Sequence, residues 1–101
     1  MSVNTNLDSA TKTLHIDVSG RFDFGLHQDF RKASEQAKSG VSQIIIDLGK
    51  VDYLDSSALG MLLVLRDRVG ESKGAVKIKN IKPDVKKILE IANFGQLFTL
   101  T

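Results

Sequence analysis

With 101 residues, the chain is long enough for one hydrophobic core and too short for two, so we expect a single domain over residues 1–101. The absence of cysteine excludes disulfides, thiol catalysis and cysteine-ligated zinc, and 6 % aromatic residues without tryptophan argue against a stacking platform for nucleic acid. The lack of a secretion signal and a longest apolar run (Ala58–Leu65) far shorter than the ~20 residues of a membrane span predict a cytoplasmic protein that does not enter the membrane, and the net charge is +2.

The N-terminal part of the chain predicts a hairpin followed by an amphipathic helix. Residues 3–7 are a weak strand candidate, and Leu14–Ser19 alternates apolar and polar residues, as a half-buried strand does. Gly20 breaks this pattern. The next apolar period is that of a helix ending near Gly40, with an apolar face made of Leu26, Phe30, Ala33 and Ala37.

The middle of the chain predicts a buried strand and a second helix. Gln43–Leu48 is a β-branched run without alternation, which is typical of a central strand covered on both faces. A helix follows the segment Gly49–Leu54, beginning at Asp55 or Ser56 and ending at Val69 or Gly70.

The C-terminal part predicts one more strand, one more helix and a short final strand at Phe98–Leu100. Val76, Ile78 and Asn80 share one face of the strand, and Pro83 suits the first turn of the helix. The apolar stripe of this helix comprises Val85, Ile88, Leu89 and Ala92. The order β-β-α-β-α-β-α implies an α/β fold, with a mixed sheet of four to five strands, three main helices and at least one right-handed crossover.

Six lysines gather between residues 73 and 87: Lys73, Lys77, Lys79, Lys82, Lys86 and Lys87. A basic patch can bind phosphates, but this one contains neither arginine nor interleaved aromatic residues, so we interpret it as solvated strand and helix faces and expect no nucleic-acid partner. We expect the lysine surplus to lie away from the end that carries Asp52, Asp55 and Ser56, which is locally acidic.

Three potential helix caps, Asp55, Ser56 and Ser57, precede an apolar run. On spacing alone, a simple helix cap is the favoured interpretation. Nevertheless, the unpartnered N–H groups and the dipole of a helix N-terminus favour negative charge, so a phosphate on Ser56 would be held well.

The helical wheel of the second helix places Ser56, Gly60 and Asp67 on its accessible side, with Val64 beside them. A glycine within a helix costs ~1 kcal/mol relative to alanine, so Gly60 either is simply tolerated or allows another backbone to approach. Met61 and Val64 at the edge of this face indicate a contact surface.

Leu54–Gly60 (L-D-S-S-A-L-G) resembles the D-S-S-[GA]-L-G signature of STAS domains, specifically those of bacterial anti-sigma-factor antagonists. Gly20–Asp23 is similar to the G-x-[LF]-D corner of the same family, and the element order and length fit its stand-alone form. Two departures are Ala58, where the family often has glycine, and Arg21, where it often has glutamate.

The resemblance implies a phosphorylation-controlled partner switch and not an enzyme. A serine kinase, commonly a GHKL-type anti-sigma factor, would phosphorylate Ser56, with Ser57 as the backup acceptor, and a PP2C-type phosphatase would reverse this. The unphosphorylated form would bind the anti-sigma factor and release its sigma factor; some relatives bind diguanylate cyclases or other output proteins. The implied partner-binding residues are Asp23, Asp55, Ser57, Gly60, Met61 and Val64, although Asp23 is equally well explained as a turn cap.

An alternative from another class is a non-switching STAS subunit of a membrane lipid transporter that docks on its cytoplasmic ATPase. A hydrolase would have to pair Ser56 or Ser57 with His15 or His27, but the G-x-S-x-G elbow is missing. The two histidines lack a metal-binding spacing, and no nucleotide-binding loop motif is present. We therefore expect no catalytic residue, metal or cofactor.

Overall fold

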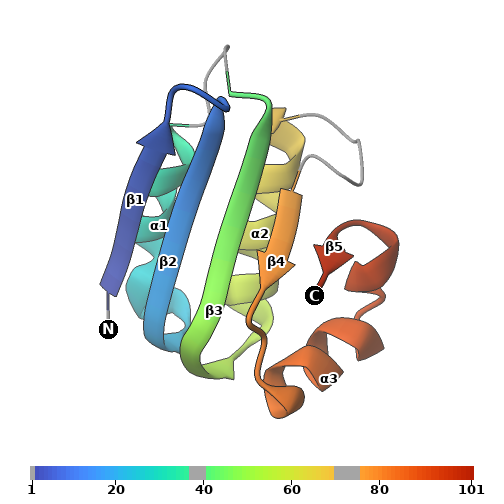
Figure 1. The fold of residues 1–101 in the computed structure, drawn as a ribbon. Coiled ribbons are helices and arrows are strands. Elements are labelled where there is room, and N and C mark those ends of the chain that lie inside the picture. The colour runs from blue at the N-terminus through green and yellow to red at the C-terminus, as the bar shows by residue number, and fades with distance from the viewer. Residues whose placement is uncertain (1, 37–40, 70–75) are drawn as a thin grey trace.

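The computed structural model describes residues 2–36, 41–69 and 76–101, which form one five-stranded sheet and three α-helices (Figure 1). The strands are β1 (Ser2–Asp8), β2 (Thr13–Phe22), β3 (Gln43–Leu54), β4 (Val76–Lys79) and β5 (Thr99–Leu100), and they are adjacent in that order. β1 is antiparallel to β2, and the other neighbours are parallel. The helices are α1 (His27–Ser34), α2 (Ser56–Val69) and α3 (Pro83–Ile91). The predicted fold class and element order are confirmed.

The helices α1 and α2 cover one face of the sheet, and α3 lies beside its C-terminal edge (Figure 1). Both crossovers, β2–α1–β3 and β3–α2–β4, step in the same direction across the sheet. Because such crossovers are right-handed, they place both helices on the same face. The core therefore lies mainly between the sheet and this helix pair, and α3 adds Val85 and Leu89 to it.

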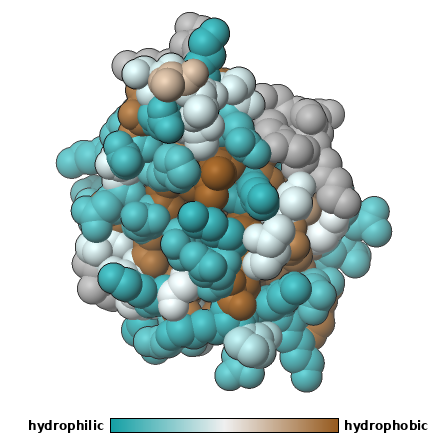
Figure 2. All heavy atoms as spheres, viewed as in Figure 1, coloured by the Kyte–Doolittle hydropathy of each residue, from teal (hydrophilic) through white to brown (hydrophobic). Residues whose placement is uncertain are grey.

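The other face of the sheet is open and mostly hydrophilic (Figure 2). The prediction that β3 is covered on both faces is wrong, since Ile44 and Ile46 are fully buried whereas Ile45 between them is only half-buried. His15 and Lys77, the register neighbours of Ile45, are polar, which is typical of a face that water reaches.

The strand β3 continues to Leu54, six residues beyond its predicted end. It remains paired with β2 up to Phe22, through register shifts after Asp17 and after Gly20. Gly20 has a φ of 88°, which a glycine adopts without strain. Gly20 and Gly49, from which the ends of these strands were predicted, instead lie within β2 and β3. The irregular register of the pair changes which residues face the core.

Several element boundaries also differ from the prediction. A 3-10 turn at Phe24–Leu26 precedes α1, while Ala37, Gly40, Gly70 and Lys73 lie outside the described residues. Asn80 follows the end of β4 with a φ of 57° and does not extend its buried face. In α3, Val85 and Leu89 are buried as predicted, whereas Ile88 is 37 % exposed.

Adjacent isoleucines of β3 allow the one-sided core to be tested. Ile44→Ala removes a side chain from the closed layer and should lower the free energy of unfolding by about 2–5 kcal/mol. Ile45→Ala changes the open face and should cost less than half as much, because that side chain is already partly hydrated. Urea unfolding of both variants measures the difference, and equal losses would contradict a core on one face only.

Candidate functional site

The candidate site lies where the neighbouring strands β2 and β3 end together. Phe22 and Leu54 are register partners, and the Asp55 N–H donates to the Phe22 carbonyl at 3.4 Å. The chain after β2 therefore begins beside the first turn of α2, although the two segments are about 30 residues apart in sequence.

The Asp55 carboxylate caps α2. Its Oδ1 accepts hydrogen bonds from the backbone N–H groups of Ser57 (3.0 Å) and Ala58 (3.1 Å), and from the Ser57 hydroxyl (2.6 Å). The pKa of Asp55 is lowered, first by the Ser57 hydroxyl and further by the backbone donors, against the opposing effect of desolvation. The predicted cap is confirmed, and it is ionised at neutral pH.

The two serines of the first turn have different surroundings. Ser57 is half-buried, and its hydroxyl proton is donated to Asp55. Ser56 is exposed, and its hydroxyl forms no hydrogen bond with any other residue that the structure describes. The Ser56 Oγ is thus accessible to an approaching reagent, whereas Ser57 is part of the cap.

Cations neutralise two of the other carboxylates at this end of the molecule. Asp52 forms an ion pair with Lys82, and Asp23 forms one with Arg21 at 3.5 Å. The Arg21 guanidinium also stacks over the Tyr53 ring at 4.0 Å, a cation–π contact. This end is therefore less acidic than predicted, and the expectation that the lysine surplus lies away from it is wrong for Lys82.

Asp23 also has a local structural role. Its side chain accepts a hydrogen bond from the Gly25 N–H at 2.9 Å and caps the 3-10 turn that leads into α1. The turn-cap interpretation of Asp23 is confirmed. The ion pair explains how Arg21 is accommodated where the family often has an acidic residue.

A groove of about 510 Å³ runs between α2 and the segment from Phe24 to Ser34. It brings together four of the predicted partner-binding residues, Ser57, Gly60, Met61 and Val64. The predicted residues Asp23 and Asp55 do not line it. Its other described lining residues are Phe24, His27, Phe30, Arg31, Ser34 and Arg68.

Sequence reasoning missed the α1 side of this groove. Phe24 is 68 % exposed and stacks on the His27 ring, with 5.1 Å between the ring centroids. The available signal was an aromatic residue that falls outside the apolar stripe of the neighbouring helix.

Gly60 leaves the middle of the groove open. A Cβ built on it would meet no atom within 4 Å. The predicted approach of another backbone is therefore not met by any other part of the described chain. The side chain is missing where the helix faces outward, so the gap is available to a partner.

Two further residues that the sequence singled out, Arg66 and His15, lie outside the groove. Arg66, which did not fit the apolar arc of α2, donates from Nε to the Leu97 carbonyl at 3.1 Å. His15 lies on the open face of the sheet beside Ile45, whereas α2, which Ser56 begins, covers the other face, so His15 is not placed to act as a base for Ser56. Among the described residues, no group of three or more His, Cys, Asp or Glu could hold a metal ion, and no helix is long and apolar enough to cross a membrane.

The family model described as STAS domain matches residues 4–101. A STAS-domain-containing protein of Pseudomonas aeruginosa is 49 % identical over 98 residues, which is 96 % of this chain and 97 % of that protein. The "Putative anti-sigma factor antagonist BtrV" of Bordetella bronchiseptica is 29 % identical over 63 residues, covering 62 % of this chain and 54 % of its own length.

Solved structures have the same fold at low sequence identity. The anti-sigma factor antagonist SpoIIAA in its unphosphorylated form has a TM-score of 0.80 at 20 % identity, covering 99 % of this chain and 88 % of its own. SpoIIAA of Bacillus in its phosphorylated form has a TM-score of 0.67 at 18 % identity, with coverages of 99 % and 91 %.

The cap can be tested through its dependence on pH. Asp55→Ala should lower the free energy of unfolding at pH 7 by about 1 kcal/mol. Because the folded pKa is lower than the ordinary value of 3.8, the stabilisation is present above that value and is lost as the pH falls through the folded pKa. Urea unfolding from pH 7 downward should show the variant and the unmodified protein converging in acid. Asp17→Ala, on the open face of the sheet, is the control, and a difference that is constant with pH would contradict a charged cap.

The glycine can be tested separately. Gly60→Ala should raise the free energy of unfolding by about 1 kcal/mol, because alanine is the better helix former and its methyl group meets no other atom. Thermal unfolding measures the change. A loss of stability would show that Gly60 is required by the fold and does not simply keep the groove open.

Proposed function

The chain belongs to the STAS-domain family, and we propose that it is an anti-sigma-factor antagonist whose binding is controlled by phosphorylation of Ser56. The observation that carries this proposal is the contrast between the two serines of the α2 first turn. The Ser56 hydroxyl is exposed and unengaged among the described residues, while the Ser57 hydroxyl is held by Asp55 at 2.6 Å. A kinase could therefore reach the Ser56 hydroxyl without breaking a hydrogen bond, whereas the Ser57 hydroxyl would first have to leave Asp55.

The chemistry required is the transfer of a phosphoryl group from ATP to the Ser56 Oγ, catalysed by a GHKL-type serine kinase that is also the anti-sigma factor. A PP2C-type phosphatase would remove the group. This chain supplies the acceptor hydroxyl and the contact surface, so its role is that of a regulated binding partner and not of an enzyme. Since ATP is the phosphoryl donor, the switch would operate in the cytoplasm.

Phosphorylation would act on the interface without refolding the domain. A phosphoserine adds about −1.5 to −2 charge with its hydration shell, next to a groove of which Ser57 forms part. The Asp55 cap occupies the N–H groups of Ser57 and Ala58, so it competes with the phosphate for these donors. The added charge would therefore face outward, where a docked partner would have to desolvate it.

The relatives support this proposal by what their names say of them. BtrV carries the name of an anti-sigma factor antagonist, and SpoIIAA is described both with and without phosphate. The unphosphorylated form of this chain would bind the anti-sigma factor and free the sigma factor; a diguanylate cyclase or another output protein would be a further partner.

Phosphopeptide mass spectrometry tests the acceptor. After incubation with the GHKL-type kinase of the native cell and ATP, the unmodified chain and Ser57→Ala should carry one phosphate on Ser56, and Ser56→Ala should carry none. Because Ser57→Ala loses a hydrogen bond to the cap, its folding is verified by circular dichroism. Phosphate on Ser57 in the unmodified chain would overturn the assignment.

Calorimetry with the same kinase tests the switch. Ser56→Ala should bind as the unmodified chain does, and Ser56→Asp should bind at least about tenfold more weakly, equivalent to ~1.4 kcal/mol. Equal affinities of the two variants would contradict the switch and favour a constitutive contact, as in the transporter-subunit alternative. Co-purification of the chain with a transporter ATPase would support that alternative.

A further inference from the structure

The groove between α1 and α2 has the dimensions of a site for a helix. On the α2 side its lining residues follow the helical repeat of three to four positions, with Gly60 and Met61 adjacent: Ser57, Gly60, Met61, Val64 and Arg68. They span twelve residues of helix, or roughly 17 Å at a rise of 1.5 Å from one residue to the next, which is about three turns. The facing wall from Phe24 to Ser34 has a similar spacing. Two such walls form a channel that a third helix can occupy.

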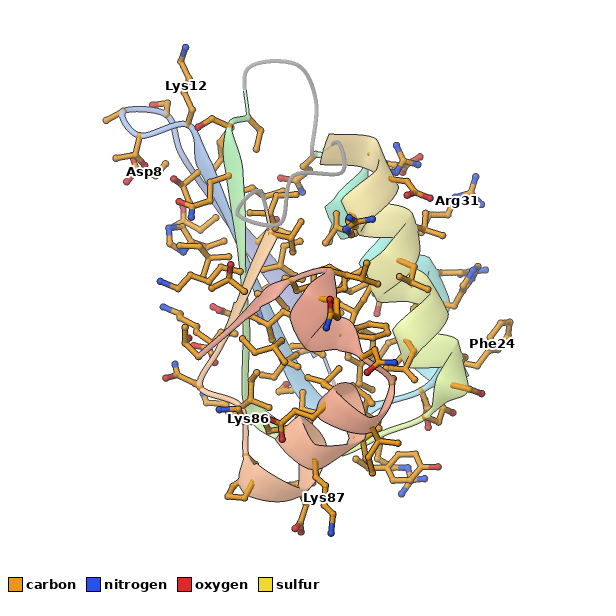
Figure 3. All side chains as sticks on the ribbon, turned by 90° about the vertical axis from the view of Figure 1, so that its right-hand side faces the viewer. Asp8, Lys12, Phe24, Arg31, Lys86 and Lys87 are labelled. Carbon is orange, nitrogen blue, oxygen red and sulfur yellow. The ribbon has the colours of Figure 1, made fainter. Side chains whose placement is uncertain are left out.

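Two apolar side chains of this channel, Phe24 and Val64, are exposed, and the described chain leaves them uncovered. Val64 is 56 % exposed, and Phe24 is among the most exposed large hydrophobic residues of the described chain. Phe30 and Met61 lie deeper in the groove and are buried. In Figure 3, Phe24 projects from the helical side of the molecule, away from the sheet. This is the arrangement expected of a contact surface that is completed by another molecule.

The ionic groups on the rim of the groove are basic. Arg31 and Arg68 line it, with His27 near one end, and no carboxylate of a described residue does so. Neither arginine forms an ion pair with another described residue. Arg31 projects on the same side of the molecule as Phe24 (Figure 3). The complementary occupant therefore combines an apolar stripe with negative charge beside it.

We propose that this groove binds an acidic amphipathic α-helix of the partner protein, with its apolar residues at i, i+4, i+7 and i+11 and aspartate or glutamate beside them. Gly60 allows the backbone of that helix to approach α2 closely, and Arg31 and Arg68 bind its carboxylates from the two sides. This is recognition of an amphipathic helix by a hydrophobic groove. The inference rests on the proposed function in one respect, because the partner is the one that Ser56 controls.

This occupant also gives the Ser56 phosphate a direct electrostatic target. Ser57, the neighbour of Ser56, lies at one end of the groove. A phosphate in this first turn would repel an acidic helix that ends there, whereas a basic helix would be attracted. The sign of charge on the bound helix therefore determines whether phosphorylation weakens or strengthens binding.

The probe for this site is a synthetic alanine-rich peptide of about four turns, held helical by a side-chain lactam, with leucine at the four apolar positions and glutamate beside them. A matched peptide carries lysine in place of every glutamate. In an NMR titration with 15N-labelled protein, the acidic peptide should shift the amide signals of Gly60, Val64 and the Phe24 segment. The basic peptide should bind at least about tenfold more weakly.

Substitutions at exposed positions test binding without disturbing the hydrophobic core. Val64→Asp and Gly60→Leu should each weaken binding of the acidic peptide at least about tenfold. The aspartate would place a negative charge beside the glutamates of the peptide, and the leucine would fill the gap at Gly60. Ile91→Asp, at a residue of α3 that is 75 % exposed and outside the groove, is the matched control and should bind as the unmodified protein does. Arg68→Glu should reverse the preference toward the basic peptide.

The proposal is overturned if the signals that shift map to the open face of the sheet, or if all variants bind alike. It is also overturned if decanoate shifts the groove signals and the acidic peptide does not. A dimer in sedimentation experiments that Val64→Asp does not form would overturn it too, because a second copy of the chain would then occupy the groove. The assay uses neither kinase nor ATP, so it can fail while Ser56 phosphorylation is observed, and it can succeed when phosphorylation is absent.

Discussion

Asp55 determines the geometry at the start of α2, where the two serines of the site lie. Its backbone N–H donates to the end of β2, and its side chain accepts three hydrogen bonds from the first turn of α2. One residue thus ends a strand, begins a helix and holds Ser57 in place. Because Oδ1 accepts the Ser57 hydroxyl, the neighbouring serine is the one left facing solvent. The identity of the accessible hydroxyl follows from how the helix is capped.

The one-sided architecture places every element of the site on the same side of the sheet. Sequential parallel strands with right-handed crossovers put α1 and α2 side by side, so the space between them extends outward from the core as a groove. Phe30 and Met61 belong to both, since they are buried in the core and also line the groove. A change in core packing near these residues would also alter the surface that a partner meets.

The sequence was sufficient for those features that depend on neighbouring residues. The alternation of Leu14, Ile16 and Val18, the Asp55 cap and the outward face of α2 were all predicted, because strand and helix periods and capping are local. The extension of β3 was not predicted, since Gly20 and Gly49 read as strand breakers until the register irregularities of the β2–β3 pair are known.

Long-range pairing limited the prediction of the site in the same way. Asp52 and Lys82 are thirty positions apart, so no local pattern indicates that a lysine neutralises this carboxylate. Phe24 could be recognised as an unusual exposed aromatic, but its position opposite Gly60 and Val64 depends on how α1 packs against α2. Local rules therefore identified the helix cap, the resemblance to STAS domains pointed to Ser56, and tertiary packing was needed to find the surface around it.

The open face of the sheet offers a position at which a label can be attached. Asp17 on β2 is exposed there, on the side of the sheet opposite α1 and α2, and the chain contains no cysteine. A single cysteine at that position would be a unique attachment point for a fluorophore or a surface linker. The label would occupy the hydrophilic side of the sheet and leave the helical side of the molecule unobstructed.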